Sequence, residues 1–145
     1  MMKVNIDKAL QDWAFECPAL ENKPLINWLN ESNGDCAIVP IPTGRGADFI
    51  DPEYINRTYD FMLQVTAQGS EVTDDINADI MQMMRDFQDW IDECEINGNY
   101  PDFGENCCCY QLKNLSEAPY AAFVYETGVM QMQCSVRLTY LEERI

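Results

Sequence analysis

One long stretch, residues 73–97, constrains the fold of this chain more than any other. Its apolar residues recur at steps of three and four, the spacing of one face of an α-helix. They are Ile76, Ile80, Met83, Met84, Phe87, Trp90, Ile91 and Cys94. Aspartates and other polar residues fill most of the remaining positions. The pattern predicts a helix about 37 Å long, with one side packed on a small sheet and the other side in water.

The two ends of this helix have their own signals. Thr73 is a suitable N-cap, and Asp74 and Asp75 stand where the positive end of the helix dipole stabilises anions. Asn97-Gly98 predicts the C-terminal end, because glycine adopts the left-handed conformation at little steric cost. An amphipathic helix with an acidic outer side is a scaffold element, and nothing on it indicates a catalytic site.

A second helix is predicted near the N-terminus, at residues 5–17. Asn5 is a suitable cap, and Pro18 follows the last apolar position. Residues 25–29 are compatible with a short strand or with a helical turn. Residues 43–52 and 98–106 contain glycine and proline between patterned segments, and they are predicted to be exposed loops.

The remaining patterned segments predict strands. They lie at residues 36–41, 54–67, 107–115, 121–126 and 129–141. The last one alternates apolar and polar residues most regularly, which indicates one buried face and one polar face. Pro40 and Pro42 cannot donate hydrogen bonds to a neighbouring strand, so the first strand is expected at an edge or end of the sheet.

The order of these elements indicates an α+β fold in a single domain, residues 1–145. We expect a mostly antiparallel sheet of four to five strands with two helices packed on it. The long helix should cover the buried face of the two longest strands. Phe87 and Trp90 are then expected to pack against four strand residues, namely Phe61, Leu63, Val136 and Leu138.

The charge of the chain restricts its partners. Its 25 Asp and Glu residues outnumber 9 Lys and Arg residues and give a formal charge of −16. Binding of duplex nucleic acid depends on cationic side chains, so nucleic acid is not expected as a bound partner, nor is an anionic membrane surface. No apolar run approaches 18 residues, and no secretion signal is expected, because the first ten residues lack an apolar segment and include Asp7.

Histidine is absent and the chain has 7 cysteines, three of them consecutive at Cys107, Cys108 and Cys109. The absence of histidine removes the commonest general base and most zinc ligand sets. Three neighbouring thiols on a strand alternate between its faces and do not converge on one metal ion. We therefore expect reduced, unpaired thiols, no catalytic residue, no cofactor site and no metal site, and hence no enzyme.

Several short stretches, taken in order, resemble the small tail-terminator or minor capsid proteins of long-tailed bacteriophages that infect Gram-positive bacteria. The similar stretches are residues 17–20 (CPAL), 38–43 (IVPIPT), 57–61 (RTYDF), 87–93 (FQDWIDE), 97–101 (NGNYP), and the segment from Tyr120 to residues 131–140 (QMQCSVRLTY). The third is similar to an Arg-Gln-Tyr-x-Phe strand in that family. The last is similar to its Tyr-Gln-Ile-Gln-Cys-x-x-x-x-Tyr ending. Residues 77–84 and 107–109 depart from the pattern.

The resemblance implies a structural protein of a phage or prophage, located in the virion at the joint between tail and neck and assembled in the host cytoplasm. Such a protein forms a homo-oligomeric ring, typically a hexamer, that caps the head-proximal end of the tail tube. Its partners would be further copies of itself, the tail tube protein and neck or head–tail connector proteins. DNA would pass through the ring without specific binding, and an acidic lumen suits that passage.

Two other interpretations remain open at this stage. The first alternative is another phage neck component, such as a head-closure or connector subunit, with a similar size and ring habit. A small cytosolic binding domain or a thiol enzyme is the second. A closed ring needs two different contact patches on each subunit, and the loops at residues 43–52 and 98–106 are the candidates for them.

Overall fold

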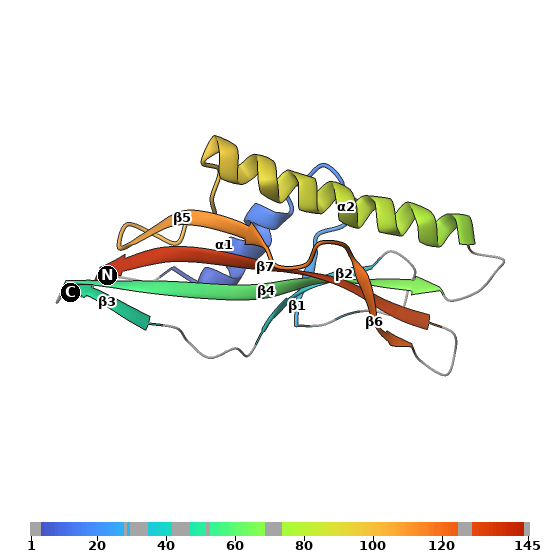
Figure 1. The fold of residues 1–145 in the computed structure, drawn as a ribbon, viewed down its shortest axis with the longest axis horizontal. Coiled ribbons are helices and arrows are strands. Elements are labelled where there is room, and N and C mark those ends of the chain that lie inside the picture. The colour runs from blue at the N-terminus through green and yellow to red at the C-terminus, as the bar shows by residue number, and fades with distance from the viewer. Residues whose placement is uncertain are drawn as a thin grey trace.

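The computed structural model describes residues 4–27, 29, 35–41, 47–51, 53–68, 74–124 and 129–143. Within these residues, two helices lie on one side of a mostly antiparallel sheet (Figure 1). The helices are α1 (Ile6–Ala14) and α2 (Asp74–Asn97). The strands are β1 (Leu25–Ile26), β2 (Cys36–Pro40), β3 (Ala47–Asp51), β4 (Tyr54–Gln68), β5 (Cys107–Asn114), β6 (Tyr120–Val124) and β7 (Val129–Glu143). The predicted α+β fold is confirmed.

Two long strands form the centre of the sheet. β4 and β7 pair antiparallel along all 15 residues of each, from Tyr54 opposite Glu143 to Gln68 opposite Val129. The other edge of β4 pairs with β3 near its start and with β2 further along. The other edge of β7 pairs with β6 near its start and with β5 further along. β1 adds one short parallel pairing to β2.

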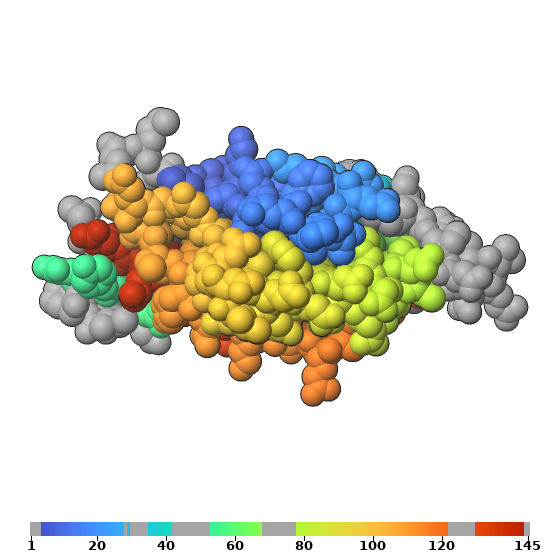
Figure 2. Space-filling model, turned by 90° about the horizontal axis from the view of Figure 1, so that it is seen from above, coloured from blue at the N-terminus to red at the C-terminus, as the bar shows by residue number. Residues whose placement is uncertain are grey.

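The alternation of residues in β4 and β7 places one apolar face under the helices. Phe61 lies opposite Val136 and Leu63 opposite Cys134, and all four side chains are fully buried. From the helix side, Leu10, Phe87 and Ile91 complete the same core and are also fully buried. Figure 2, seen from the helix side, shows α1 and the chain that follows it lying beside α2 over this face.

Aromatic rings join the two helices. The rings of Trp13 on α1 and Trp90 on α2 have centroids 4.7 Å apart, and Phe87 lies 5.9 Å from Trp90. Trp13 also donates its indole N–H to the carbonyl of Asn99. Phe87 belongs to the core with the four strand residues expected from the sequence. Trp90 is only partly buried, and its closest ring is Trp13, a partner that periodicity does not reveal.

The helix ends follow the local signals where they are described. The side chain of Asn5 accepts a hydrogen bond from the backbone N–H of Lys8, as expected for an N-cap. Gly98 has φ of +69° at the end of α2, the left-handed conformation expected there. α1 ends at Ala14, three residues before the predicted end. Thr73, the expected cap of α2, lies outside the described residues.

The sheet has more strands than the four to five that were predicted. Within the described residues it has seven, because residues 25–29 contribute β1 and the predicted loop at 43–52 contains β3. The loop prediction was therefore wrong for Ala47–Asp51. This short segment has no regular strand pattern of its own, and it is a strand because it pairs with the first residues of β4. Residues 42–46 and Pro52 lie outside the described residues. β2 was expected at an edge or end of the sheet, but β1 lies outside it and pairs with Ala37 and Ile38; Pro40, the last residue of β2, lies beyond that pairing.

The packing of Phe87 leads to a stability prediction. Phe87→Ala removes a fully buried ring and should lower the free energy of unfolding by about 3–5 kcal/mol, since a cavity is left in the core. The matched control is Ile96→Ala on the same helix, where the side chain is 82% exposed. That change should stay within about 0.5 kcal/mol. Urea unfolding measures both, and equal effects would contradict the assigned orientation of α2.

Candidate functional site

The three consecutive thiols do not form a common site. Cys107 and Cys109 are partly buried on the helix side of β5, whereas Cys108 is exposed on the opposite side. Burial raises the pKa of Cys109 to about 12 and also raises the pKa of Cys107. All seven cysteines are free thiols. A thiol nucleophile needs a lowered pKa, so these two partly buried thiols are held in their unreactive form.

The other four cysteines are core residues. Burial raises the pKa of Cys36 and Cys94 to about 11 and the pKa of Cys134 to about 12. Burial also raises the pKa of Cys17. Within the described residues, no three His, Cys, Asp or Glu side chains are grouped to hold a metal ion. No helix among them is long and apolar enough to cross a membrane.

The free edge of β5 is covered by polar side chains of α2. The carboxylate of Glu95 accepts a hydrogen bond from the backbone N–H of Leu112. The side-chain amide of Asn114 donates to the carbonyl of Gln88 at 3.0 Å and to the carboxylate of Asp92 at 2.9 Å. An uncovered strand edge is a template for pairing with another chain, so these contacts close that edge to β-sheet association.

A groove lies between α2 and the chain that leaves β5. Its volume is about 440 Å³, and it is lined by Gln82, Arg85, Gln88, Asp89, Asp92, Asn114, Leu115, Ser116 and Glu117. The amide of Gln88 donates to the carbonyl of Ser116 at 2.9 Å, so part of the lining is occupied in joining the helix to the strand. Small-molecule sites are mostly apolar, and this groove is open and polar. Its polar groups connect α2 to the chain that follows β5.

The second notable surface is the side of the sheet opposite the helices, here called the sheet face. It consists of the even-numbered side chains 54–66 of β4, the odd-numbered side chains 131–143 of β7, and Cys108, Gln111 and Lys113 of β5. Amides and hydroxyls predominate on it. Among the described residues its charged side chains are Asp60, Lys113, Arg137 and Glu143, which together give a charge of 0 (two cations and two acids).

One ion pair fixes the centre of the sheet face. Arg137 donates two hydrogen bonds to the carboxylate of its register partner Asp60, at 2.8 and 3.0 Å. The side chain of Asp60 is 2% exposed, whereas that of Arg137 is 44% exposed. A buried carboxylate is tolerated when its hydrogen bonds are made, and the two bonds fix the guanidinium relative to the carboxylate. The hydrogen-bond donation by Arg137 to Asp60 raises the pKa of the guanidinium.

A row of glutamines extends from this centre along the sheet face. The amide of Gln64 lies 3.4 Å from the side-chain oxygen of Gln133, and that of Gln131 lies 3.3 Å from it. Gln133 in turn donates to the hydroxyl of Tyr120 on β6 at 2.8 Å. The two contacts above 3.2 Å are long for hydrogen bonds. These amides therefore keep donor capacity for a further acceptor.

The structure describes the two loops that were expected to carry contact patches to different extents. Much of the loop at 98–106 is used within the chain, since Phe103 is buried and its ring packs edge-on at 5.3 Å from Tyr140. The hydroxyl of Tyr100 donates to the carbonyl of Tyr110. Most of the loop at 43–52 is either β3 or outside the described residues. Sequence reasoning predicted a polar face on the last strand, but it did not identify the neighbouring strands that extend this face or assign a role to it.

Comparisons with known proteins do not test the resemblance to tail-terminator proteins. No protein-family model matches the chain, and a search of curated proteins finds no significant match. The structure therefore establishes the α+β fold. The assignment to a family is a hypothesis that depends on the order of the short stretches.

The thiol geometry makes a prediction about reactivity. Native protein at pH 8 treated with a chromogenic disulfide should show one fast-reacting thiol, Cys108, because it is the exposed one and burial keeps Cys109 and Cys134 protonated. Cys108→Ser should remove the fast phase, and Cys134→Ser should leave it unchanged. Several fast thiols in the native protein would contradict the burial of the others.

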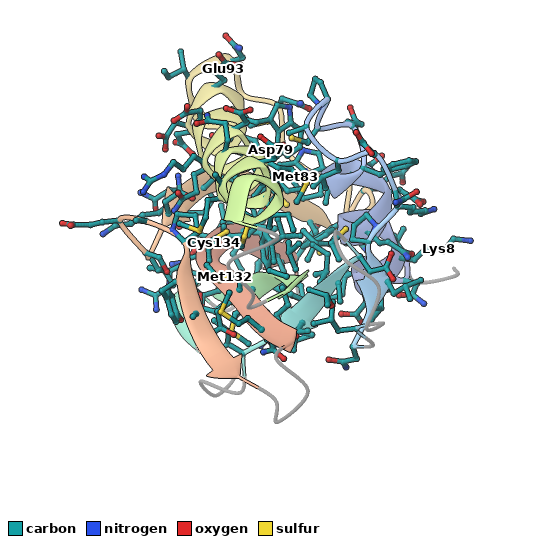
Figure 3. All side chains as sticks on the ribbon, turned by 90° about the vertical axis from the view of Figure 1, so that its right-hand side faces the viewer. Lys8, Asp79, Met83, Glu93, Met132 and Cys134 are labelled. Carbon is teal, nitrogen blue, oxygen red and sulfur yellow. The ribbon has the colours of Figure 1, made fainter. Side chains whose placement is uncertain are left out.

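The covered edge of β5 makes a second prediction. Glu95→Ala leaves the backbone N–H of Leu112 without its acceptor and should lower the free energy of unfolding by about 1–3 kcal/mol. Glu93→Ala is the control, since Glu93 is exposed on the side of α2 turned away from the sheet (Figure 3). Light scattering on warming should also increase for Glu95→Ala alone, because the edge becomes available. Indistinguishable variants would show that Glu95 does not protect the edge.

Proposed function

We propose that this chain is a structural, non-enzymatic protein of a phage or prophage tail that forms a ring capping the head-proximal end of the tail tube. The proposal comes from the ordered stretches that resemble tail-terminator and minor capsid proteins. Its partners are other copies of itself, the tube protein and neck proteins, and DNA passes through the ring without specific binding. The ring is proposed to be a hexamer located in the virion.

The observation that carries the proposal is where the similar stretches lie in the fold. Residues 57–61 lie in β4 and residues 131–140 in β7, and the two strands pair directly. Asp60 from the first stretch and Arg137 from the second form the bidentate ion pair at the centre of the sheet face. Residues 87–93 lie in α2 above them. Stretches that are far apart in the sequence thus lie together in one framework, and this common location supports the proposal.

The distribution of chemistry supports a structural role over a thiol enzyme. The thiols with a resolved pKa shift all have raised values, and burial is the main cause in each case. The groove is polar and joins two elements, and many of its groups are already hydrogen-bonded within the chain. What remains is a scaffold with large polar surfaces, which is what an assembly subunit needs.

Electron microscopy of particles that lack the gene tests the function directly. In a phage or inducible prophage that carries it, deletion should give tails of variable and excessive length, because tube polymerisation is no longer stopped. Complementation in trans should restore a uniform length. Tails of normal length on full heads that leak DNA would instead identify a head-closure or connector subunit, the main competing assignment.

The charge of the chain predicts how the ring assembles. Six copies carry −96 (6 × −16), and this self-repulsion is screened over about 30 Å at 0.01 M salt but about 8 Å at 0.15 M. The purified protein should be monomeric at low salt and form larger species as salt rises or when tail tubes are added. Sedimentation velocity across a salt series measures this. A monomer at every salt concentration, with tubes present, would refute the ring.

A further inference from the structure

The two broad surfaces of this protein differ in charge. The exposed charged side chains of α2 among the described residues are one arginine and five acids, a charge of −4. They are Asp79, Arg85, Asp86, Asp89, Asp92 and Glu93. Among the described residues the sheet face has a charge of 0, although the whole chain has −16. Most contacts between two copies therefore bring acidic side chains against acidic side chains. The sheet face is a broad surface that lacks this excess of acids.

The size of the sheet face suits a specific interface. β4 and β7, each of 15 residues, extend about 50 Å, and the three strands of the sheet face span about 10–15 Å at a spacing of about 4.8 Å. Their product, about 500–750 Å², comes close to the roughly 800 Å² that each partner contributes to a typical stable protein interface. Among the described residues both helices lie on the other side of the sheet (Figure 3).

The groups on the sheet face are suited to receiving carboxylates. Lys113 is exposed on β5 next to Arg137, its register partner on β7. The amides of Gln64, Gln131 and Gln133 provide further N–H donors, since their contacts with one another are long. Carboxylates accept hydrogen bonds from both kinds of group, and charge-assisted bonds are the stronger ones. An acidic helix surface has complementary chemistry.

We propose that the sheet face is a self-assembly surface that binds the acidic outer side of α2 from a second copy of this chain. The contact is head-to-tail, because two different surfaces meet and each copy keeps one of each free. Such contacts close into rings when the rotation between copies allows it. The inference rests on the self-association in the proposed function and identifies the two surfaces responsible for it.

A charge exchange tests the contact. Lys113→Glu places an acid on the sheet face, and Glu93→Lys places a cation on the outer side of α2; both residues are exposed, so folding should be retained and is checked by circular dichroism. Each variant alone should associate at least about tenfold more weakly than the parent protein in 0.15 M salt, because one attraction becomes a repulsion. Sedimentation velocity over a concentration series gives the association constants.

Mixing the two variants gives the decisive result. In an alternating assembly, the acid introduced by Lys113→Glu meets the cation introduced by Glu93→Lys at one junction, and the unchanged residues meet at the next. An equimolar mixture should therefore recover most of the parent association. Lys8→Glu, an equal charge change at an exposed position of α1, is the matched control and should behave like the parent. Association of Lys113→Glu at the parent level, no recovery in the mixture, or an equal loss in Lys8→Glu would each overturn the proposal.

The two proposals fail in different ways. A parent protein that associates through other surfaces refutes the sheet-face contact and leaves the tail assignment intact. Association that follows the charge exchange, together with normal tail length in the deletion particles, supports the contact and refutes the tail assignment. A parent protein that stays monomeric at all salt and protein concentrations, with tubes added, refutes both.

Discussion

The pairing of β4 with β7 is the interaction on which the rest of this structure depends. It joins 15 residues of each strand and places Phe61, Leu63, Val136 and Cys134 in one apolar layer. On the opposite side, the same register brings Asp60 to Arg137 and aligns the polar row. A shift of one residue would exchange the two faces and bury the glutamines instead. The apolar layer and the ion pair therefore specify the same register from opposite sides.

The helices contact both the core and the edge of the sheet. The apolar stripe of α2 completes the core through Phe87 and Ile91, whereas Gln88, Asp92 and Glu95 bind the β5 strand and the chain beyond it. α1 is attached through Trp13, which contacts Trp90, and through Asp7, which accepts a hydrogen bond from Tyr59. Burial, with a smaller contribution from Asp7, raises the pKa of Tyr59 and keeps the phenol protonated as a donor. The outer side of α2 keeps an excess of acids over cations.

Elements with a long regular pattern were predictable from the sequence, and those made by pairing were not. The stripe of α2 and the alternation of β7 are local properties, so both were identified to within a few residues. β1 and β3 are short, and they become strands because β2 and β4 provide an edge for them. The contact of Trp90 with Trp13 also escaped prediction, because periodicity says which side of a helix is buried but not which neighbour covers it. From the sequence, the sheet face could be predicted only as the polar positions of single strands. The strand order is needed to show that these positions lie side by side.

The order in which the central strands are synthesised has a consequence for folding. Paired residues of β4 and β7 are separated by 61 to 89 positions (129 − 68 and 143 − 54), so the central pairing closes a long loop. Non-local pairing of this kind slows folding. During translation, β4 must wait without its main partner until β7 leaves the ribosome, and its apolar side chains stay exposed meanwhile. A chain of this topology is therefore expected to depend on chaperone protection during synthesis more than its final compact form suggests.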